Sequence, residues 1–327
     1  MATTTRPVPK LPFRLPPPPP HWKRWVAGTF ALLCVVVLVG GLGGNWQVPG
    51  RSADGLPNCG TLRPRAIIGS FGAPDPQPPR AMRETFATPP AGTWCSSNVG
   101  HGETTFGPEG VTLQTPRTRN GVVPTRAALF PYHRAGVTAK PAFTLGMTAA
   151  MRVGPLDLDG FGGSAGWGVS NGSLDPRAAE MAWFMVNRSG GPVGFLGQQF
   201  GSPGFHLLGE DFPRGFFIMA KDAGIDVPQV KLLDESLLGR GHSYAIELGE
   251  EQVEFYVDGE PVGVFDSPPK GTAHDLATGD LPLLGQFWLD RGFWLPLPIP
   301  QLANREHELT MSEYRQGPAD RTPRILR

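Results

Sequence analysis

Apolar and polar residues alternate in short runs along most of the chain. The clearest example is the segment 242–265, HSYAIELGEEQVEFYVDGEPVGVF, in which Tyr244, Ile246 and Leu248 recur with a period of two. The same period returns twice more, after turns that include the pair Asp258-Gly259. A period of two is typical of a β-strand with one buried face. The segment therefore predicts an antiparallel meander of three strands.

Similar strand-length runs recur elsewhere, each bounded by turn residues. They are GVTLQT at 110–115, FTLGMTAAMRV at 143–153, EMAWFMV at 180–186, GFFIMA at 215–220 and LTMSEYR at 309–315. Only 226–238 shows helical spacing, through Val230, Leu233 and Leu237. The pattern predicts one all-β domain, which we place at 83–317, followed by a C-terminal tail at 318–327.

The N-terminal part of the chain has a different pattern. Residues 1–24 hold eight prolines and five basic residues but no acidic ones, and predict a Pro-rich basic tail without a core. The segment 26–44 is apolar and uncharged over nineteen residues, about 28 Å of helix, which is long enough to span a bilayer. We expect a transmembrane signal anchor at 25–46, with residues 1–24 cytoplasmic because the basic residues precede the span. A cleaved secretory signal is the alternative.

The segment 47–82 is rich in proline and predicts an extracytoplasmic linker. Of the three cysteines, Cys34 lies within the predicted span, so Cys59 and Cys95 are the two on the outer side. Disulfides persist in that compartment, and we expect these two to be bridged, with two free buried thiols as the alternative.

The charge balance excludes one class of partner. The chain has 29 basic and 29 acidic residues and a formal net charge of +0, so it lacks the basic surface of a nucleic-acid-binding protein. The 44 glycines and 37 prolines favour many turns over long helices. Both observations agree with an all-β extracytoplasmic domain.

The meander carries a family resemblance. Residues 244–264 resemble a recurrent segment of the concanavalin A-like lectin and glucanase superfamily, especially laminarinase-type glycoside hydrolases and laminin-G-like modules, with Leu248 where tryptophan is commonest there. MSEYRQ at 311–316 resembles the closing strand of that family. The resemblance implies a jelly-roll sandwich of two antiparallel sheets, one of them concave enough to hold a glycan.

The resemblance also implies a position for catalytic carboxylates. A retaining glycosidase needs two, about 5 to 5.5 Å apart, and the family carries them in an E-x-D-x-x-E motif on a concave strand. Here the matching segment reads EMAWFM: Glu180 matches the first glutamate, but Ala182 and Met185 replace the other two acids. We interpret Glu180 as the remnant of a degenerate catalytic motif. An active enzyme would need another acid, such as Asp175 or Glu210.

Other residue types suggest binding rather than catalysis. Sugar rings stack on aromatic side chains in sheets of this family, so we consider four tryptophans as carbohydrate-binding candidates, with burial in the core as the alternative for each: Trp167, Trp183, Trp288 and Trp294. Asp157 and Asp159 have oxygens that a calcium ion could use, although a solvated turn is the better explanation, because the other ligands of a calcium-binding loop are missing; no other cofactor is indicated.

Together these patterns predict a single-pass membrane protein whose extracytoplasmic domain binds a cell-envelope polysaccharide without hydrolysing it. Its other partner would be the lipid bilayer, through 25–46. Two alternatives stay open: an active glycoside hydrolase of β-glucan-type polysaccharides, and a structural cell-envelope module that binds another protein.

Overall fold

The computed structural model describes residues 55–56, 81–90, 94–98, 101–117, 125–131, 146–170, 180–188, 213–222, 228–266, 269, 284–291 and 305–326. The chain separates into two compact units, Met1–Gln47 and Val48–Arg327, and all the described residues belong to the second. The predicted cytoplasmic tail and span, and all of the linker except 55–56 and 81–82, lie outside the described residues. Within the described ranges, no helix is long and apolar enough to cross a membrane.

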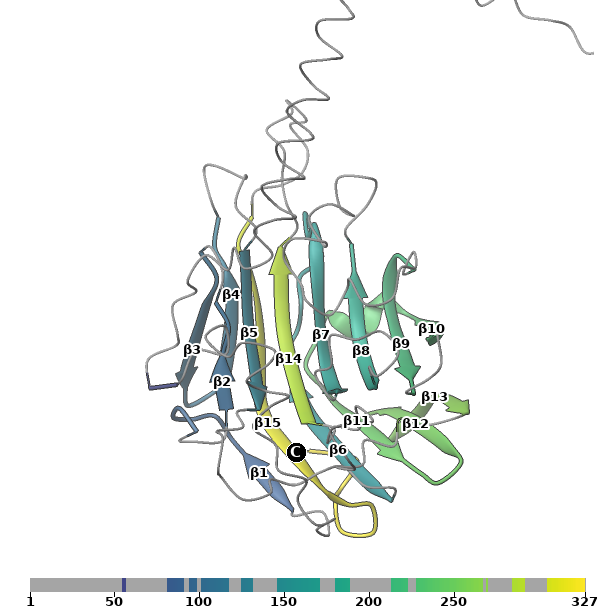
Figure 1. Cartoon of the computed structure of the whole chain (residues 1–327). Helices are drawn as coiled ribbons and strands as arrows, with labels where there is room; N and C mark the ends of the chain where they lie inside the picture. The colour runs from purple at the N-terminus through teal and green to yellow at the C-terminus, as the bar shows by residue number, and fades with distance from the viewer. Residues whose placement is uncertain are drawn as a thin grey trace, which may run out of the picture. The chain divides into compact units, whose positions relative to one another are not determined.

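Two antiparallel sheets make up the described part of the protein (Figure 1). The eight-stranded sheet has the order β13-β12-β11-β6-β15-β4-β3, with β1 paired to β15. Its strands are β1 (Met82–Glu84), β3 (Glu103–Gly107), β4 (Gly110–Thr115), β6 (Met147–Val153), β11 (His242–Leu248), β12 (Gln252–Val257), β13 (Glu260–Asp266) and β15 (His307–Pro318).

The seven-stranded sheet has the order β10-β9-β8-β7-β14-β5-β2. Its strands are β2 (Trp94–Ser96), β5 (Thr125–Pro131), β7 (Gly163–Ser170), β8 (Met181–Asn187), β9 (Gly215–Lys221), β10 (Gln229–Leu233) and β14 (Leu284–Arg291). The predicted all-β domain of two antiparallel sheets is confirmed, and the arrangement is consistent with a jelly-roll sandwich.

The predicted meander is present as β11, β12 and β13. Tyr244 pairs with Val257 and Ile246 with Phe255, so the apolar residues of neighbouring strands share one face. The second turn places Asp258 at φ 51° and Gly259 at φ 85°, the left-handed backbone that a tight hairpin requires.

The helical spacing noted for 226–238 is a wrong prediction for most of that segment. Its described part forms β10, followed by a short 3₁₀ helix, η2 (Glu235–Leu238), which begins with the side chain of Asp234 accepting a hydrogen bond from the backbone N–H of Ser236 at 2.9 Å. Pairing with β9 prevails over the local spacing, because Val230 lies opposite Met219 along the edge of the sheet.

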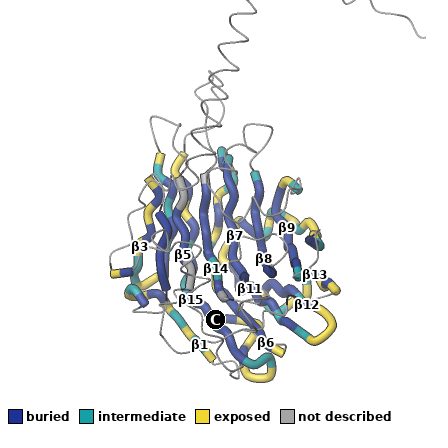
Figure 2. The backbone as a smooth tube through the Cα atoms, viewed as in Figure 1, coloured by how far each residue is buried: buried dark blue, intermediate teal, exposed yellow. Residues whose placement is uncertain are grey.

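The main core lies between the two sheets. Inward residues of both sheets form one apolar cluster. The central strands are buried along much of their length (Figure 2). Near its centre Trp167 stacks on Phe184, with ring centroids 6.3 Å apart, and meets the edge of Tyr244 at 4.8 Å. The hydroxyl of Tyr244 donates to the carbonyl of Leu237 at 3.2 Å, which ties η2 to β11.

Candidate functional site

The outward face of the seven-stranded sheet carries a second apolar cluster. Side chains alternate along each strand, so the residues between the core positions point away from the eight-stranded sheet. On β8, for example, Ala182 and Phe184 belong to the main core, whereas Trp183 belongs to the second cluster. We call this outward face the Trp–Met face. The members of its apolar cluster are Ala128, Met181, Trp183, Met185, Phe217, Met219 and Trp288.

Two glycines of β7 make room for the two indoles of this face. Gly166 is the Cα partner of Trp288, and Gly168 is the Cα partner of Trp183. A Cβ on Gly166 would lie 2.2 Å from the Trp288 ring, and a Cβ on Gly168 would lie 2.8 Å from the Trp183 ring. The rings therefore lie against β7 from its two neighbouring strands, 4.9 Å apart in an edge-to-face contact.

Polar side chains occupy both ends of this face. At one end, Asp290, Ser164 and Asn187 lie in one cross-strand row, and all three are buried. Ser164 accepts a hydrogen bond of 3.4 Å from the Trp288 indole. At the other end Lys221 is buried on β9. The face thus combines an apolar centre with polar groups at its ends, as ligand sites commonly do.

The apolar centre continues to the edge strand β10. Leu232 is the Cα partner of Phe217 and Val230 of Met219, so both side chains lie on the outward face. Leu232 is 59% exposed. The centre is different: Trp183 and Trp288 are each 3% exposed. Among its described residues, the face is therefore closed over its indoles and most exposed at its β10 edge.

The degenerate catalytic motif divides between the two faces. Glu180 directly precedes β8 and is buried, in the same alternation as the core residue Ala182. Met185 lies instead on the Trp–Met face. Among the outward residues whose side chains the structure describes on this sheet, the one carboxylate is Asp290. Asp175 and Glu210 lie outside the described residues.

The structure describes three of the four candidate tryptophans, and they do not share one face. Trp183 and Trp288 meet on the Trp–Met face. Trp167 points into the core between the sheets and is 0% exposed, so its proposed place in a groove is corrected: it is a core residue. Trp294 lies outside the described residues. Sequence reasoning missed Asp290, which follows Trp288 by two positions and so shares its face.

The two aspartates considered for calcium form a turn. The Asp157 carboxylate accepts a hydrogen bond of 2.8 Å from the backbone N–H of Asp159, and the Asp159 carboxylate forms an ion pair with Arg305. In the part of the chain that the structure describes, no group of three or more His, Cys, Asp or Glu side chains could hold a metal ion. The Asp159 carboxylate is thus paired with the exposed side chain of Arg305.

The cysteine prediction is tested at one end. Cys95 lies on β2, buried and disulfide-bonded. Cys34 and Cys59 lie outside the described residues, so the pairing of Cys95 with Cys59 stays a prediction.

Solved structures to which this chain is similar include several glucanases. The β-glucanase of Bacillus licheniformis matches with a TM-score of 0.45 and 12% identity, over 74% of this chain and 99% of that chain. A prokaryotic β-1,3-1,4-glucanase (lichenase) derived from a mouse hindgut metagenome matches with a TM-score of 0.42 and 13% identity, over 73% of this chain and 99% of that chain. LamAcat from Zobellia galactanivorans matches with a TM-score of 0.43 and 12% identity, over 74% of this chain and 98% of that chain. No protein-family model and no curated protein sequence matches the chain.

Because the TM-scores are below 0.5 and the identities are about 12%, these likenesses carry no argument about activity or ligand. In structure the chain is similar to these glucanases.

Proposed function

We propose that this protein is a carbohydrate-binding protein that does not hydrolyse its ligand, and that the ligand contacts the Trp–Met face. The observation that carries the proposal is the indole pair of Trp183 and Trp288, which lies between two polar ends on an outward sheet face. Indoles offer apolar faces to sugar C–H groups, and polar side chains such as Asn187 and Asp290 can accept or donate hydrogen bonds to hydroxyls.

The described carboxylates of this face do not provide the pair that hydrolysis needs. A retaining mechanism needs a nucleophile and a proton donor about 5 to 5.5 Å apart. The described part of the Trp–Met face offers Asp290 alone, and Glu180 follows the alternation of the core residues of β8. One carboxylate cannot serve as both nucleophile and acid. Loss of the general acid alone costs a rate factor of about 10² to 10⁴.

A second candidate function is favoured by the burial of the indoles. Rings that are 3% exposed pack as a second core, and such a face gives rigidity rather than a binding groove. On this reading the protein is a structural cell-envelope module that binds another protein. The two candidates differ in one respect: a carbohydrate ligand must expose the rings, whereas a structural face stays closed.

The proposed location follows from the N-terminal sequence. The uncharged apolar segment at 25–46, preceded by five basic residues, supports a single-pass anchor with the β domain outside the cytoplasm. A reporter enzyme that functions only outside the cytoplasm, fused after Arg327, should be active. Activity of a cytoplasm-specific reporter at the same position would contradict the location.

The binding proposal is tested with the full chain in detergent micelles. Soluble β-glucans and arabinogalactans are titrated against the wild type, Trp183→Phe, Trp288→Phe and, as a control, Val264→Ala on the other sheet, where Val264 is exposed. We expect saturable binding that both indole substitutions weaken and the control leaves unchanged, with no release of reducing ends. Release of reducing ends that Glu180→Gln abolishes would establish the hydrolase instead.

A further inference from the structure

The outward face of the eight-stranded sheet has a notch at its centre. Ala245 of β11 and Ala150 of β6 are Cα partners, and the residues next in the same row are Tyr256 of β12 and Arg315 of β15. Two methyl side chains between two long ones leave a depression in the face. The notch is filled by the side chain of Leu326, which is 2% exposed and clusters with both alanines and Tyr256.

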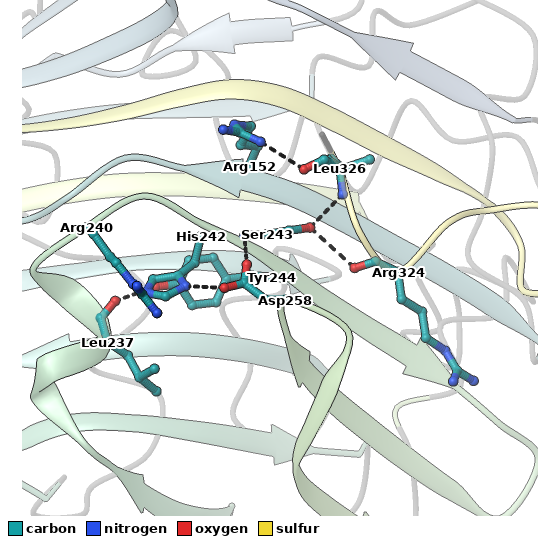
Figure 3. Close-up of polar contacts among 9 residues, drawn as sticks. All are labelled: Arg152, Leu237, Arg240, His242, Ser243, Tyr244, Asp258, Arg324 and Leu326. Atoms are coloured by element: carbon teal, nitrogen blue, oxygen red, sulfur yellow. Dashed lines mark hydrogen bonds and ion pairs between the residues drawn. The ribbon is translucent and has the colours of Figure 1, made fainter.

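Side chains of the sheet also hold the backbone next to Leu326. The hydroxyl of Ser243 accepts a hydrogen bond of 2.8 Å from the N–H of Leu326 and donates one of 3.3 Å to the carbonyl of Arg324. The guanidinium of Arg152 donates to the carbonyl of Leu326 at 3.0 Å (Figure 3). Ile325, between the two anchored residues, is 46% exposed. The anchored side chains of Arg324 and Leu326 thus flank a half-exposed one.

A third contact recognises the cation at Arg324. Its guanidinium lies over the Tyr256 ring, 4.3 Å from the centroid, and forms a salt bridge with Glu247 at 2.6 Å. Glu254, which accepts a hydrogen bond from the Tyr256 hydroxyl, adds a second negative charge beside the ring. A planar cation that stacks on a ring and binds a carboxylate is the geometry that arginine favours.

The backbone of Ser243 is itself held by Asp258, which in turn contacts His242. Its backbone N–H donates to one oxygen of Asp258 at 2.9 Å, and the other oxygen lies 2.6 Å from Nδ1 of His242. Arg240 donates to Nε2 of the same ring at 3.3 Å, so Nδ1 is the nitrogen that donates to Asp258 (Figure 3). Asp258 therefore holds the backbone of Ser243 in addition to the pairing of β11 with its neighbours.

We propose that this face is a docking site for an extended peptide of the form Arg-x-Leu, and that residues 324–326 are its resident and displaceable occupant. The site selects a guanidinium through Glu247 and Tyr256, an extended backbone through Ser243 and Arg152, and an aliphatic side chain through the alanine notch. Two residues of the segment, Arg324 and Leu326, make these contacts, and a short connection keeps the resident segment at an effective concentration of about 1 mM. A partner segment with the same chemistry competes against that concentration.

The test uses the full chain in micelles and a fluorescent peptide with the sequence of residues 319–327, ADRTPRILR. The double variant Arg324→Ala, Leu326→Ala empties the site, because it removes both anchoring side chains. We expect it to bind the peptide saturably and at least tenfold more tightly than the wild type, whose own segment competes. Adding Ala245→Leu, which fills the notch, should abolish binding, whereas adding Val264→Ala should not.

Two results would overturn the proposal. One is a cooperatively folded double variant that does not bind the peptide at about 1 mM, or binds it equally well with the notch filled. The other is loss of cooperative folding in the single variant Arg324→Ala as well as in the double variant. In that case the segment would be an integral part of the sheet and not a displaceable occupant.

Discussion

The outward faces of the two sheets are both buried at their centres, but by different chemistry. On the seven-stranded sheet the centre is made of indole rings and methionines, and the glycines of β7 let the rings lie close against the sheet. On the eight-stranded sheet the centre is made of two alanines with serine, arginine and glutamate around them, and a short segment of the same chain fills it.

This difference determines what it would take to open the buried centre of each face. The Trp–Met face is held by shape and apolar area, so opening it exposes large rings to water. The other face is held by a few directed contacts to one segment, and each of them can be removed singly. The substitutions below test this contrast, in order of decreasing effect.

The largest expected effect is on the indole pair. Trp183→Ala or Trp288→Ala should lower the free energy of unfolding by about 3 to 5 kcal/mol, the cost of truncating a large buried aromatic residue. Urea denaturation followed by circular dichroism measures it, with Leu232→Ala at the exposed edge of the same face as the control. A loss below about 1 kcal/mol would show that the rings are not packed as a core.

The next effect is on the segment that fills the other face. Leu326→Ala should cost about 1.5 to 3 kcal/mol, because the variant loses the apolar area that the leucine side chain buries in the alanine notch. Ile325→Ala is the matched control, since the neighbouring side chain is nearly half exposed. Equal losses for the two variants in thermal unfolding would mean that the notch adds no stability.

A smaller effect is expected at β7. Gly166→Ala places a Cβ against the Trp288 ring, and the displaced ring should cost about 1 to 3 kcal/mol, the usual range for overpacking. The control is Gly162→Ala, because a Cβ at Gly162 would meet nothing within 4 Å. If both variants unfold at the same denaturant concentration as the wild type, the glycine does not set the position of the ring.

The smallest effect depends on pH. Burial alone would raise the pKa of Asp258, but hydrogen bonds from the Ser243 N–H and from His242 outweigh it and hold the pKa below its ordinary value of 3.8. A lowered carboxylate pKa stabilises the fold above the unfolded-state value, and the contribution disappears as the pH falls through the folded-state value. We therefore expect the stability difference between the wild type and Asp258→Asn to narrow below about pH 4.

Asparagine tolerates the left-handed backbone of residue 258, so the turn itself should persist in this variant. Urea midpoints measured between about pH 6 and pH 3 give the comparison. A difference that stays constant across that interval would show that the carboxylate charge does not hold Ser243.

The sequence predicted several strands correctly, but it did not predict on which face of a sheet each tryptophan lies. Alternation alone found the meander, because Tyr244, Ile246 and Leu248 each pack into the main core. It did not find which of the tryptophans share a face, because that depends on cross-strand register: Trp167 and Trp288 lie on paired strands but on opposite sides of the sheet. Asp290 was missed because no strand was predicted at 284–291, although alternation along that strand places it on the face of Trp288.

Long-range contacts explain the other failures. The segment 226–238 shows helical spacing locally, and only its pairing with β9 makes Val230 and Leu232 outward residues of a strand. The segment at 324–326 carries no local pattern at all, since the groups that hold it, Arg152 and Ser243, lie far away in the sequence.

The most direct test of the central proposal is fluorine NMR of the full chain labelled with 5-fluorotryptophan. The chain has eight tryptophans. Single Trp→Phe substitutions assign the resonances. On addition of the polysaccharide that binds, the resonances of Trp183 and Trp288 should shift, whereas those of the core residues Trp94 and Trp167 should not. Saturating polysaccharide that leaves Trp183 and Trp288 unchanged would contradict carbohydrate binding at the Trp–Met face.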